Sequence, residues 1–183
     1  IQNLARSYGV TASNVVLGLF SEVISRWSIN KNFGISLTLM DRSEDEMGVV
    51  GDFTSVEILS ILNSDKPFLE KVKELQHNLI EDMAHSDFSG LEVLRELNRR
   101  KNINIIFPVV YTSTLGTEDN KKSYDYLSSK SIEIVGGVSR TPQVWIDCHV
   151  IETIDGLEIN WDIRENIFEQ YVIDDMFRKF SQL

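Results

Sequence analysis

The sequence predicts an α/β (α+β) fold in which several helices pack on a mixed β-sheet. Three observations support this class. Apolar residues recur at helical spacing over 11–28, they alternate with polar residues over 33–40, and Asp155-Gly156 separates two strand-like segments. The first pattern is typical of an amphipathic helix, the second of a half-buried strand, and the third of a β-hairpin. A chain of 183 residues is long enough for one domain with a substantial core.

The N-terminal part is expected to contain a helix followed by a strand. The helix covers 11–28, and Thr11 is a residue type that favours the N-cap position. The strand covers 33–40. An acidic segment with two glycines, 41–52, is expected to be a loop. A short apolar segment, 53–62, follows it.

The middle of the chain predicts two further helices and a strand. Pro67 opens the second helix, at a first-turn position that suits proline. The third helix begins with a capping box formed by Ser89 and Glu92. The apolar run 103–111 is expected to be a strand. Because Pro108 lies inside it, the strand is predicted to be at an edge of the sheet or at a bulge.

The C-terminal part is expected to be mainly β-structure. Residues 114–130 are polar and predict an exposed loop. Strands are expected over 131–136, 143–153 and 157–162, with the Asp-Gly pair between the last two. A closing helix is expected over 169–180. The sequence has no internal repeat and no glycine-rich nucleotide-binding motif.

Composition narrows the classes of partner and the compartment. The net charge of −10 repels phosphate backbones, so no nucleic acid is expected. No apolar run reaches the ~18 residues of a membrane helix, so no membrane partner is expected. The single cysteine forms no disulfide within the chain, which favours a cytoplasmic protein. The sequence begins at Ile1 without a secretory signal, and we expect a fragment of a longer protein.

The histidines and the cysteine suggest no metal site and only weak catalytic candidates. His77 and Glu81 are four residues apart on a helix and are interpreted as a surface pair rather than a proton relay. His85 ends that helix, where its positive charge suits the helix dipole. Cys148 and His149 alternate on a strand, so one of them faces the core. Cys148 has no evident base to make it a nucleophile.

Polar residues gather where three predicted strands begin or end. The stretches are "VVGDFTS" (49–55), "PVVYTSTLG" (108–116) and "SRTPQVWID" (139–147). Loops that leave a sheet are where functional sites are usually built. From spacing alone, turn chemistry and a functional site remain equally open for all three.

These stretches resemble a known family. "GDFTS" (51–55), "PVVYTS" (108–113) and "TPQVWID" (141–147) are similar, in order, to signature segments of the heterocyclization domains of nonribosomal peptide synthetases. These domains are a branch of the condensation-domain family. Further similar segments are "HSDFSGLEVLRELNRR" (85–100), "LEINWDI" (157–163) and "DDMF" (174–177). The resemblance runs from about residue 4 to the end and corresponds to the C-terminal half of the domain.

The resemblance implies one lobe, residues 1–183, of a chloramphenicol-acetyltransferase-like pair. It implies that a carrier-bound acyl or peptidyl thioester condenses with cysteine, serine or threonine and cyclodehydrates to a thiazoline or oxazoline. The implied partners are the N-terminal lobe, upstream and downstream carrier proteins and an adenylation domain. No cofactor binds directly, because substrates arrive on carrier phosphopantetheine. The family's DxxxxD segment is not found here, so the isolated lobe is expected to be inactive, with an uncovered apolar surface that favours self-association.

The resemblance also implies the site residues. Thr112 and Asp147 match the threonine and aspartate implicated in ring formation, and we expect them to lie close together at adjacent strand ends. Cyclodehydration needs a base and then an acid, and partial burial beside an aromatic residue lets an aspartate serve as both. No metal ligand is expected. The predicted substrate-site residues are Asp41, Asp52, Thr54, Ser113, Thr141, Gln143 and Trp145.

Two departures from the family pattern motivate an alternative. Asp41 stands where members often have asparagine, and Arg140 where they often have glutamine. They raise the hypothesis of a non-catalytic lobe that docks a carrier protein or a neighbouring domain. An exposed Asp147 with nothing near Thr112 would favour this alternative. The absence of HHxxxDG argues against a stand-alone acyltransferase.

Overall fold

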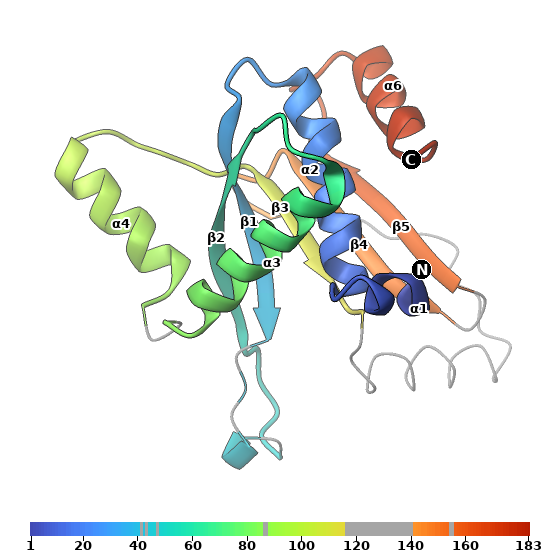
Figure 1. Cartoon of the computed structure of the whole chain (residues 1–183). Coiled ribbons are helices and arrows are strands. Elements are labelled where there is room, and N and C mark those ends of the chain that lie inside the picture. Colours follow the sequence, from blue (N-terminus) through green and yellow to red (C-terminus); the bar gives the residue numbers. More distant parts are fainter. Residues whose placement is uncertain (41, 43, 47, 86–87, 116–140, 154–155) are drawn as a thin grey trace, which may run out of the picture.

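The computed structural model of the chain describes residues 1–40, 42, 44–46, 48–85, 88–115, 141–153 and 156–183 (Figure 1). It confirms a mixed sheet flanked by helices. No described helix is both long and apolar enough to cross a membrane. The elements in chain order are α1 (Gln2–Ser7), α2 (Ala12–Trp27), β1 (Asn32–Met40), η1 (Glu44–Glu46), β2 (Thr54–Leu62), α3 (Phe68–Met83), α4 (Gly90–Lys101), β3 (Val109–Ser113), β4 (Ile146–Thr153), β5 (Gly156–Ile163) and α6 (Gln170–Phe180).

The sheet has the strand order β2-β1-β3-β4-β5. The central strands β1, β3 and β4 run parallel, and β2 and β5 are antiparallel to their neighbours at the two edges. Tyr111 of β3 is the register partner of Leu37 on one side and Cys148 on the other. Because β1, β3 and β4 are parallel, their C-terminal ends point toward the same edge of the sheet.

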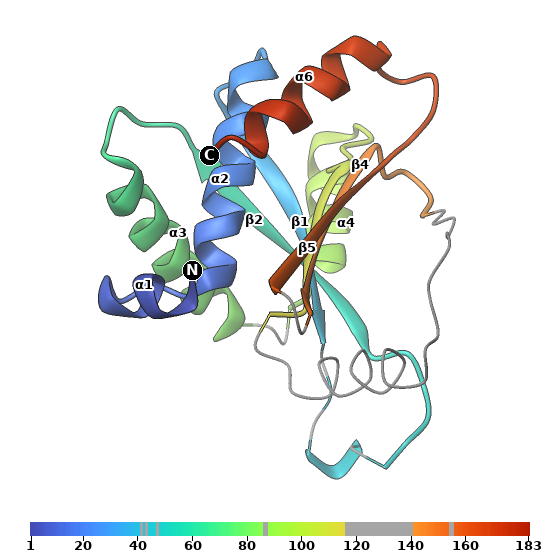
Figure 2. The ribbon, with the colours of Figure 1, turned by 90° about the vertical axis from the view of Figure 1, so that its right-hand side faces the viewer.

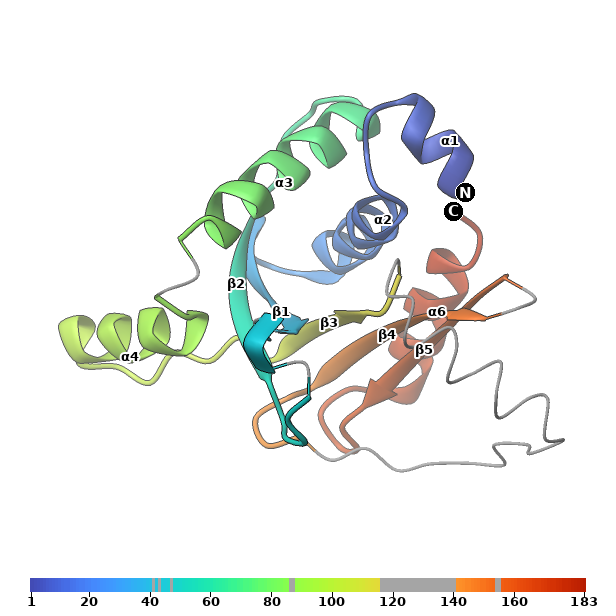
Figure 3. The ribbon, with the colours of Figure 1, turned by 90° about the horizontal axis from the view of Figure 1, so that it is seen from below.

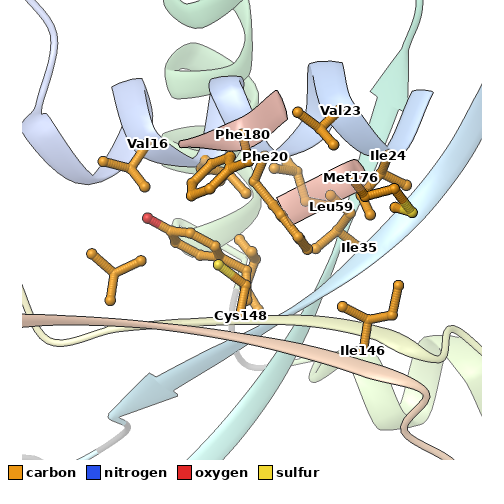
Figure 4. Packing of buried hydrophobic residues seen from close by; sticks show 14 of the residues in the cluster. Val16, Phe20, Val23, Ile24, Ile35, Leu59, Ile146, Cys148, Met176 and Phe180 are labelled. Carbon is orange, nitrogen blue, oxygen red and sulfur yellow. The ribbon is translucent and has the colours of Figure 1, made fainter. Parts of the chain in front are cut away.

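The main core lies between one face of the sheet and helices α2 and α6. Phe20 of α2 is fully buried at its centre, and its ring lies 5.2 Å from Trp161 and 6.1 Å from Tyr111. Figure 4 shows Phe20 and Phe180 facing Ile35 and Cys148 of the sheet. Apolar burial of this kind is the main stabilising contribution in a domain of this size.

The predicted helix starts are confirmed by their caps. The Thr11 hydroxyl accepts a hydrogen bond of 3.1 Å from the backbone amide of Asn14, and α2 begins at the next residue, Ala12. Ser89 and Glu92 form the expected capping box of α4. Pro67 occupies the N-cap of α3, one position before the first helical turn in which it was predicted.

Pro108 predicted an edge strand or a bulge, and the edge position is wrong because β3 is the central strand. Strand β3 begins at Val109, so the missing amide hydrogen of Pro108 falls outside the ladder. The Pro108 carbonyl instead accepts hydrogen bonds from Trp145 and Ile146, at 2.8 and 3.2 Å. The preceding residues are held by Asn98, whose side chain bonds the backbone of Ile105 at 2.6 and 3.2 Å.

The remaining sequence predictions concern the C-terminal hairpin, the segments before it and the N-terminal helix. Strands β4 and β5 pair antiparallel as predicted, and Gly156 opens β5 with a φ of 143°. Asp155, the strand predicted over 131–136 and most of the loop predicted over 114–130 lie outside the described residues. Helix α1 was not expected. It has six residues and no side-chain cap, so its local signal is weak.

Candidate active site

The two faces of the sheet differ in covering and in chemistry. Helices α1, α2 and α3 lie on one side, whereas α4 lies on the other side and beyond β2 (Figures 2 and 3). Gly90 lets α4 approach β2 closely, because a Cβ there would lie 2.5 Å from the Val56 carbonyl oxygen. Among the described helices, none covers β3, β4 and β5 on the face away from α2. Strand alternation gives that face Ser36, Thr38, Val110, Thr112, Asp147, His149, Asn160 and Asp162.

Thr112 and Asp147 form a pair on this face. The Thr112 hydroxyl donates a hydrogen bond of 3.4 Å to Asp147 Oδ1. Asp147 is only 8% exposed, so its carboxylate is largely removed from water. The predicted proximity of the two side chains is confirmed, but the prediction that both lie at strand ends is wrong for Asp147, which is the second residue of β4. A hydroxyl beside a shielded carboxylate is an arrangement that can accept and return a proton.

The pair belongs to a longer row of polar side chains that the sequence interpretation missed. Thr38 Oγ1 lies 2.9 Å from Thr112 Oγ1. His149 Nε2 lies 3.3 Å from Asp147 Oδ2 and 3.8 Å from Asp162 Oδ2. Both distances are those of an ion pair, but Nε2 does not meet the geometry of a hydrogen bond. The row Thr38–Thr112–Asp147–His149–Asp162 therefore connects β1, β3, β4 and β5.

The pKa of His149 is shifted by its neighbours in this row. Its close contact with the Asp147 carboxylate raises the pKa of His149 above the ordinary 6.5. Burial opposes the shift, and the negative charges of Asp147 and Asp162 add to it. A folded-state pKa above the unfolded one means that the ion pair stabilises the fold fully below about pH 6.5. That stabilisation is lost as the pH rises through the folded-state value.

We expect His149→Gln to destabilise the chain more at about pH 6 than at about pH 9. The additional loss at the lower pH is about 0.2–1 kcal/mol in the free energy of unfolding, because the pair is partly exposed. Urea unfolding at the two pH values measures it. The matched control is His77→Gln, since the His77 side chain is 70% exposed in its pair with Glu81. Equal losses at both pH values for His149→Gln would contradict the prediction.

Asp52, Thr54 and Ser113 do not join the Thr112–Asp147 pair. The Thr54 amide donates to Asp52 Oδ1 at 2.9 Å, which makes a local turn before β2. Hydrogen bonds from Thr54 lower the pKa of Asp52. Ser113 follows Thr112 on β3, so it points to the opposite face, where its hydroxyl accepts a 3.4 Å hydrogen bond from the Leu115 amide.

The "TPQVW" segment forms the turn that leads into β4. Gln143 has a φ of 65°, and the Val144 amide bonds the Thr141 carbonyl at 3.4 Å. The Trp145 ring packs against the core and lies 6.4 Å from Phe168, edge to face. Trp145 therefore anchors the start of β4. Asp41 and Arg140 lie outside the described residues.

The remaining candidates behave as structural residues. Cys148 is fully buried in the core, and burial raises the pKa of its thiol to about 12. A thiol in that state is a poor nucleophile. His85 Nδ1 lies 2.9 Å from the Glu81 carbonyl at the end of α3, as expected for a helix-terminal histidine. In the described part of the chain, no three His, Cys, Asp or Glu side chains gather as metal ligands.

A surface cleft lies among α2, β2 and α3, and it holds none of the predicted site residues. Its lining includes Lys71 and Glu22, which pair with each other at 2.6 Å. The candidate residues Thr112 and Asp147 lie outside this cleft, on the polar face of the sheet.

The mixed sheet, covered on one face and polar on the other, defines a chloramphenicol-acetyltransferase-like lobe. The sequence profile of the condensation domain matches residues 1–183. The chain belongs to the condensation-domain family, which confirms the resemblance seen in the sequence.

Three relatives illustrate the similarity. Pyochelin synthetase PchF of Pseudomonas aeruginosa is 34% identical over 184 residues, which cover 98% of this chain and 10% of that protein. Phenyloxazoline synthase MbtB of Mycobacterium tuberculosis is 34% identical over 181 residues, covering 94% of this chain and 12% of that protein. The EpoB cyclization-docking bidomain of a nonribosomal peptide synthetase from Sorangium cellulosum has a TM-score of 0.84 at 32% identity, covering 99% of this chain and 37% of that chain. The chain thus spans about a tenth of the length of these curated relatives.

Proposed function

We propose that this chain is the C-terminal lobe of a heterocyclization domain in a nonribosomal peptide synthetase. The domain condenses a carrier-bound acyl or peptidyl thioester with cysteine, serine or threonine, and then closes a thiazoline or oxazoline ring. The observation that carries the proposal is the Thr112–Asp147 pair, with 3.4 Å between the hydroxyl and Oδ1 and with Asp147 only 8% exposed. The printed names of a phenyloxazoline synthase and a cyclization bidomain among the similar proteins also support it.

The pair suits the chemistry of ring closure. The side-chain thiol or hydroxyl of the new residue attacks the carbonyl carbon of the newly formed amide. A bond forms from sulfur or oxygen to that carbon, and the carbonyl oxygen becomes a hydroxyl group. The C–O bond then breaks, the amide nitrogen loses its proton, and one water leaves as the C=N bond forms. The first step needs a base and the second an acid, and Asp147 serves as both in turn.

Thr112 has a supporting role in this proposal. Its hydroxyl contacts Asp147 Oδ1 at 3.4 Å and Thr38 Oγ1 at 2.9 Å, so its orientation is restrained from two sides. A restrained hydroxyl can steer the carboxyl group or donate to the oxygen that develops charge. The largely buried state of Asp147 disfavours the alternative of a docking lobe without catalysis.

The proposal includes the partners that the reaction needs. These are an N-terminal lobe that completes the site, an upstream and a downstream carrier protein with phosphopantetheine, and an adenylation domain. The isolated chain is then expected to make no ring, and its uncovered surface is expected to favour self-association.

The complete synthetase that contains this lobe tests the proposal. The upstream carrier is loaded with an acyl group and the downstream carrier with cysteine, serine or threonine. Intact-protein mass of the downstream carrier should then show the condensed species with one water fewer than the open amide. Accumulation of the open amide alone, with each of the three amino acids, would reject heterocyclization and leave ordinary condensation.

A further inference from the structure

His149 lies in the candidate site but has no role in the proposed mechanism of ring closure. It lies on the same face of β4 as Asp147, two residues further along the strand. Its register partners are Thr112 on β3 and Asn160 on β5. Its Nε2 nevertheless lies beside Asp147 and Asp162, which are themselves register partners on β4 and β5. The ring thus leans back along the strand into the gap between two carboxylates.

This placement engages both oxygens of the Asp147 carboxylate. Oδ1 accepts from the Thr112 hydroxyl at 3.4 Å, and Oδ2 faces His149 Nε2 at 3.3 Å. A carboxylate held from both sides has little freedom to rotate. The imidazole on the opposite side therefore limits how far the Asp147 carboxylate can turn.

The surrounding charges favour the imidazolium form. Asp147 on the same strand and Asp162 on β5 are the charged groups that act on His149, and Thr112 on β3 does not titrate. With a neutral ring, Asp147 and Asp162 leave two negative charges side by side. A proton on His149 reduces the net negative charge of this group from two to one. The His149 side chain is only 30% exposed, so water screens the interaction incompletely.

We propose that His149 is a positioning residue for ring closure, which as imidazolium fixes the Asp147 carboxylate and bridges it to Asp162. The inference rests on the proposed function of the Thr112–Asp147 pair. It adds that this lobe closes rings most efficiently while His149 is protonated. Condensation does not depend on this bridge, because the attacking amine needs no help from Asp147.

The test compares the complete synthetase with His149→Gln over about pH 6 to 9. Glutamine stays neutral at every pH and keeps an amide donor, so it imitates the unprotonated ring. We expect the wild type to close rings about tenfold faster than the variant at pH 6, well below the 10²–10⁴-fold effect of losing the acid–base group itself. The ratio should approach one near pH 9, and condensation rates should match throughout.

Two further variants separate positioning from general damage. Asp162→Asn removes one of the two carboxylates beside His149, so the decline of ring closure should move to lower pH. His77→Gln, on the exposed surface of α3, should reproduce the wild-type profile. A constant wild-type-to-His149→Gln ratio across the pH range, or equal losses of condensation and cyclisation, would overturn the inference. A wild type that condenses but forms no ring at any pH would reject both the proposed function and the inference, and the two failures are therefore distinguishable.

Discussion

Replacing Asp147 with asparagine should slow ring formation by about 10²–10⁴-fold and leave condensation nearly unchanged, because in the proposed mechanism only ring closure uses this carboxyl group as acid and base. Amide formation begins with an amine, which is already a good nucleophile when neutral. Ring closure must activate a thiol or hydroxyl and then expel water. Asparagine keeps the shape and one oxygen that can accept from Thr112, so the fold should persist. The open species, one water heavier than the ring product, should accumulate on the downstream carrier.

The matched control for this experiment is Asp65→Asn. This substitution makes the same chemical change in the exposed loop between β2 and α3. The variant should therefore behave as the wild type. Intact-protein mass at short reaction times separates the open and closed species. Near-normal cyclisation by Asp147→Asn, or equal losses of condensation and cyclisation, would show that Asp147 is not the acid–base group of ring closure.

The elements that the sequence predicted well have local signals. Thr11 caps α2, and the Ser89–Glu92 capping box starts α4, and each of these contacts joins residues close in the chain. Alternation of apolar residues likewise identified β1, because one face of that strand packs on the core. Such features depend on spacing alone and need no knowledge of the tertiary structure.

The position of β3 depends on long-range pairing, which spacing does not reveal. Pro108 predicted an edge strand or a bulge, but its carbonyl accepts from Trp145 and Ile146 at the start of β4, and β3 begins after it. The hydrogen bonds of β3 go to β1 and β4, which are distant in sequence. A proline that immediately precedes a strand is therefore compatible with a central position in the sheet.

The candidate site was predictable in part. The resemblance to heterocyclization domains identified Thr112 and Asp147, and alternation along β4 contained a signal for His149, since it lies two residues after Asp147. The same alternation turns Cys148, which lies between them, into the core. Thr38 required the parallel pairing of β1 with β3, which brings it opposite Thr112.

The stability of the chain should be sensitive to substitutions in the core, on the opposite side of the sheet from the polar face. We expect Phe20→Ala to lower the free energy of unfolding of the 183-residue chain by about 3–5 kcal/mol, the range for removing a buried aromatic ring. Phe20 is 0% exposed, and its ring contacts those of Tyr111 and Trp161. Since small domains are stable by only about 5–15 kcal/mol, the variant should lose a large part of its total stability.

The same substitution should also disturb the site from the opposite side of the sheet. Tyr111 directly precedes Thr112, and Trp161 directly precedes Asp162, so both rings that contact Phe20 lie beside residues of the polar row. Guanidinium unfolding followed by tryptophan fluorescence measures the stability loss. The matched control is Tyr171→Ala on α6, where the side chain is 73% exposed and the change should stay within about 0.5 kcal/mol. Similar unfolding midpoints for the two variants would mean that the Phe20 cluster does not hold the sheet in place.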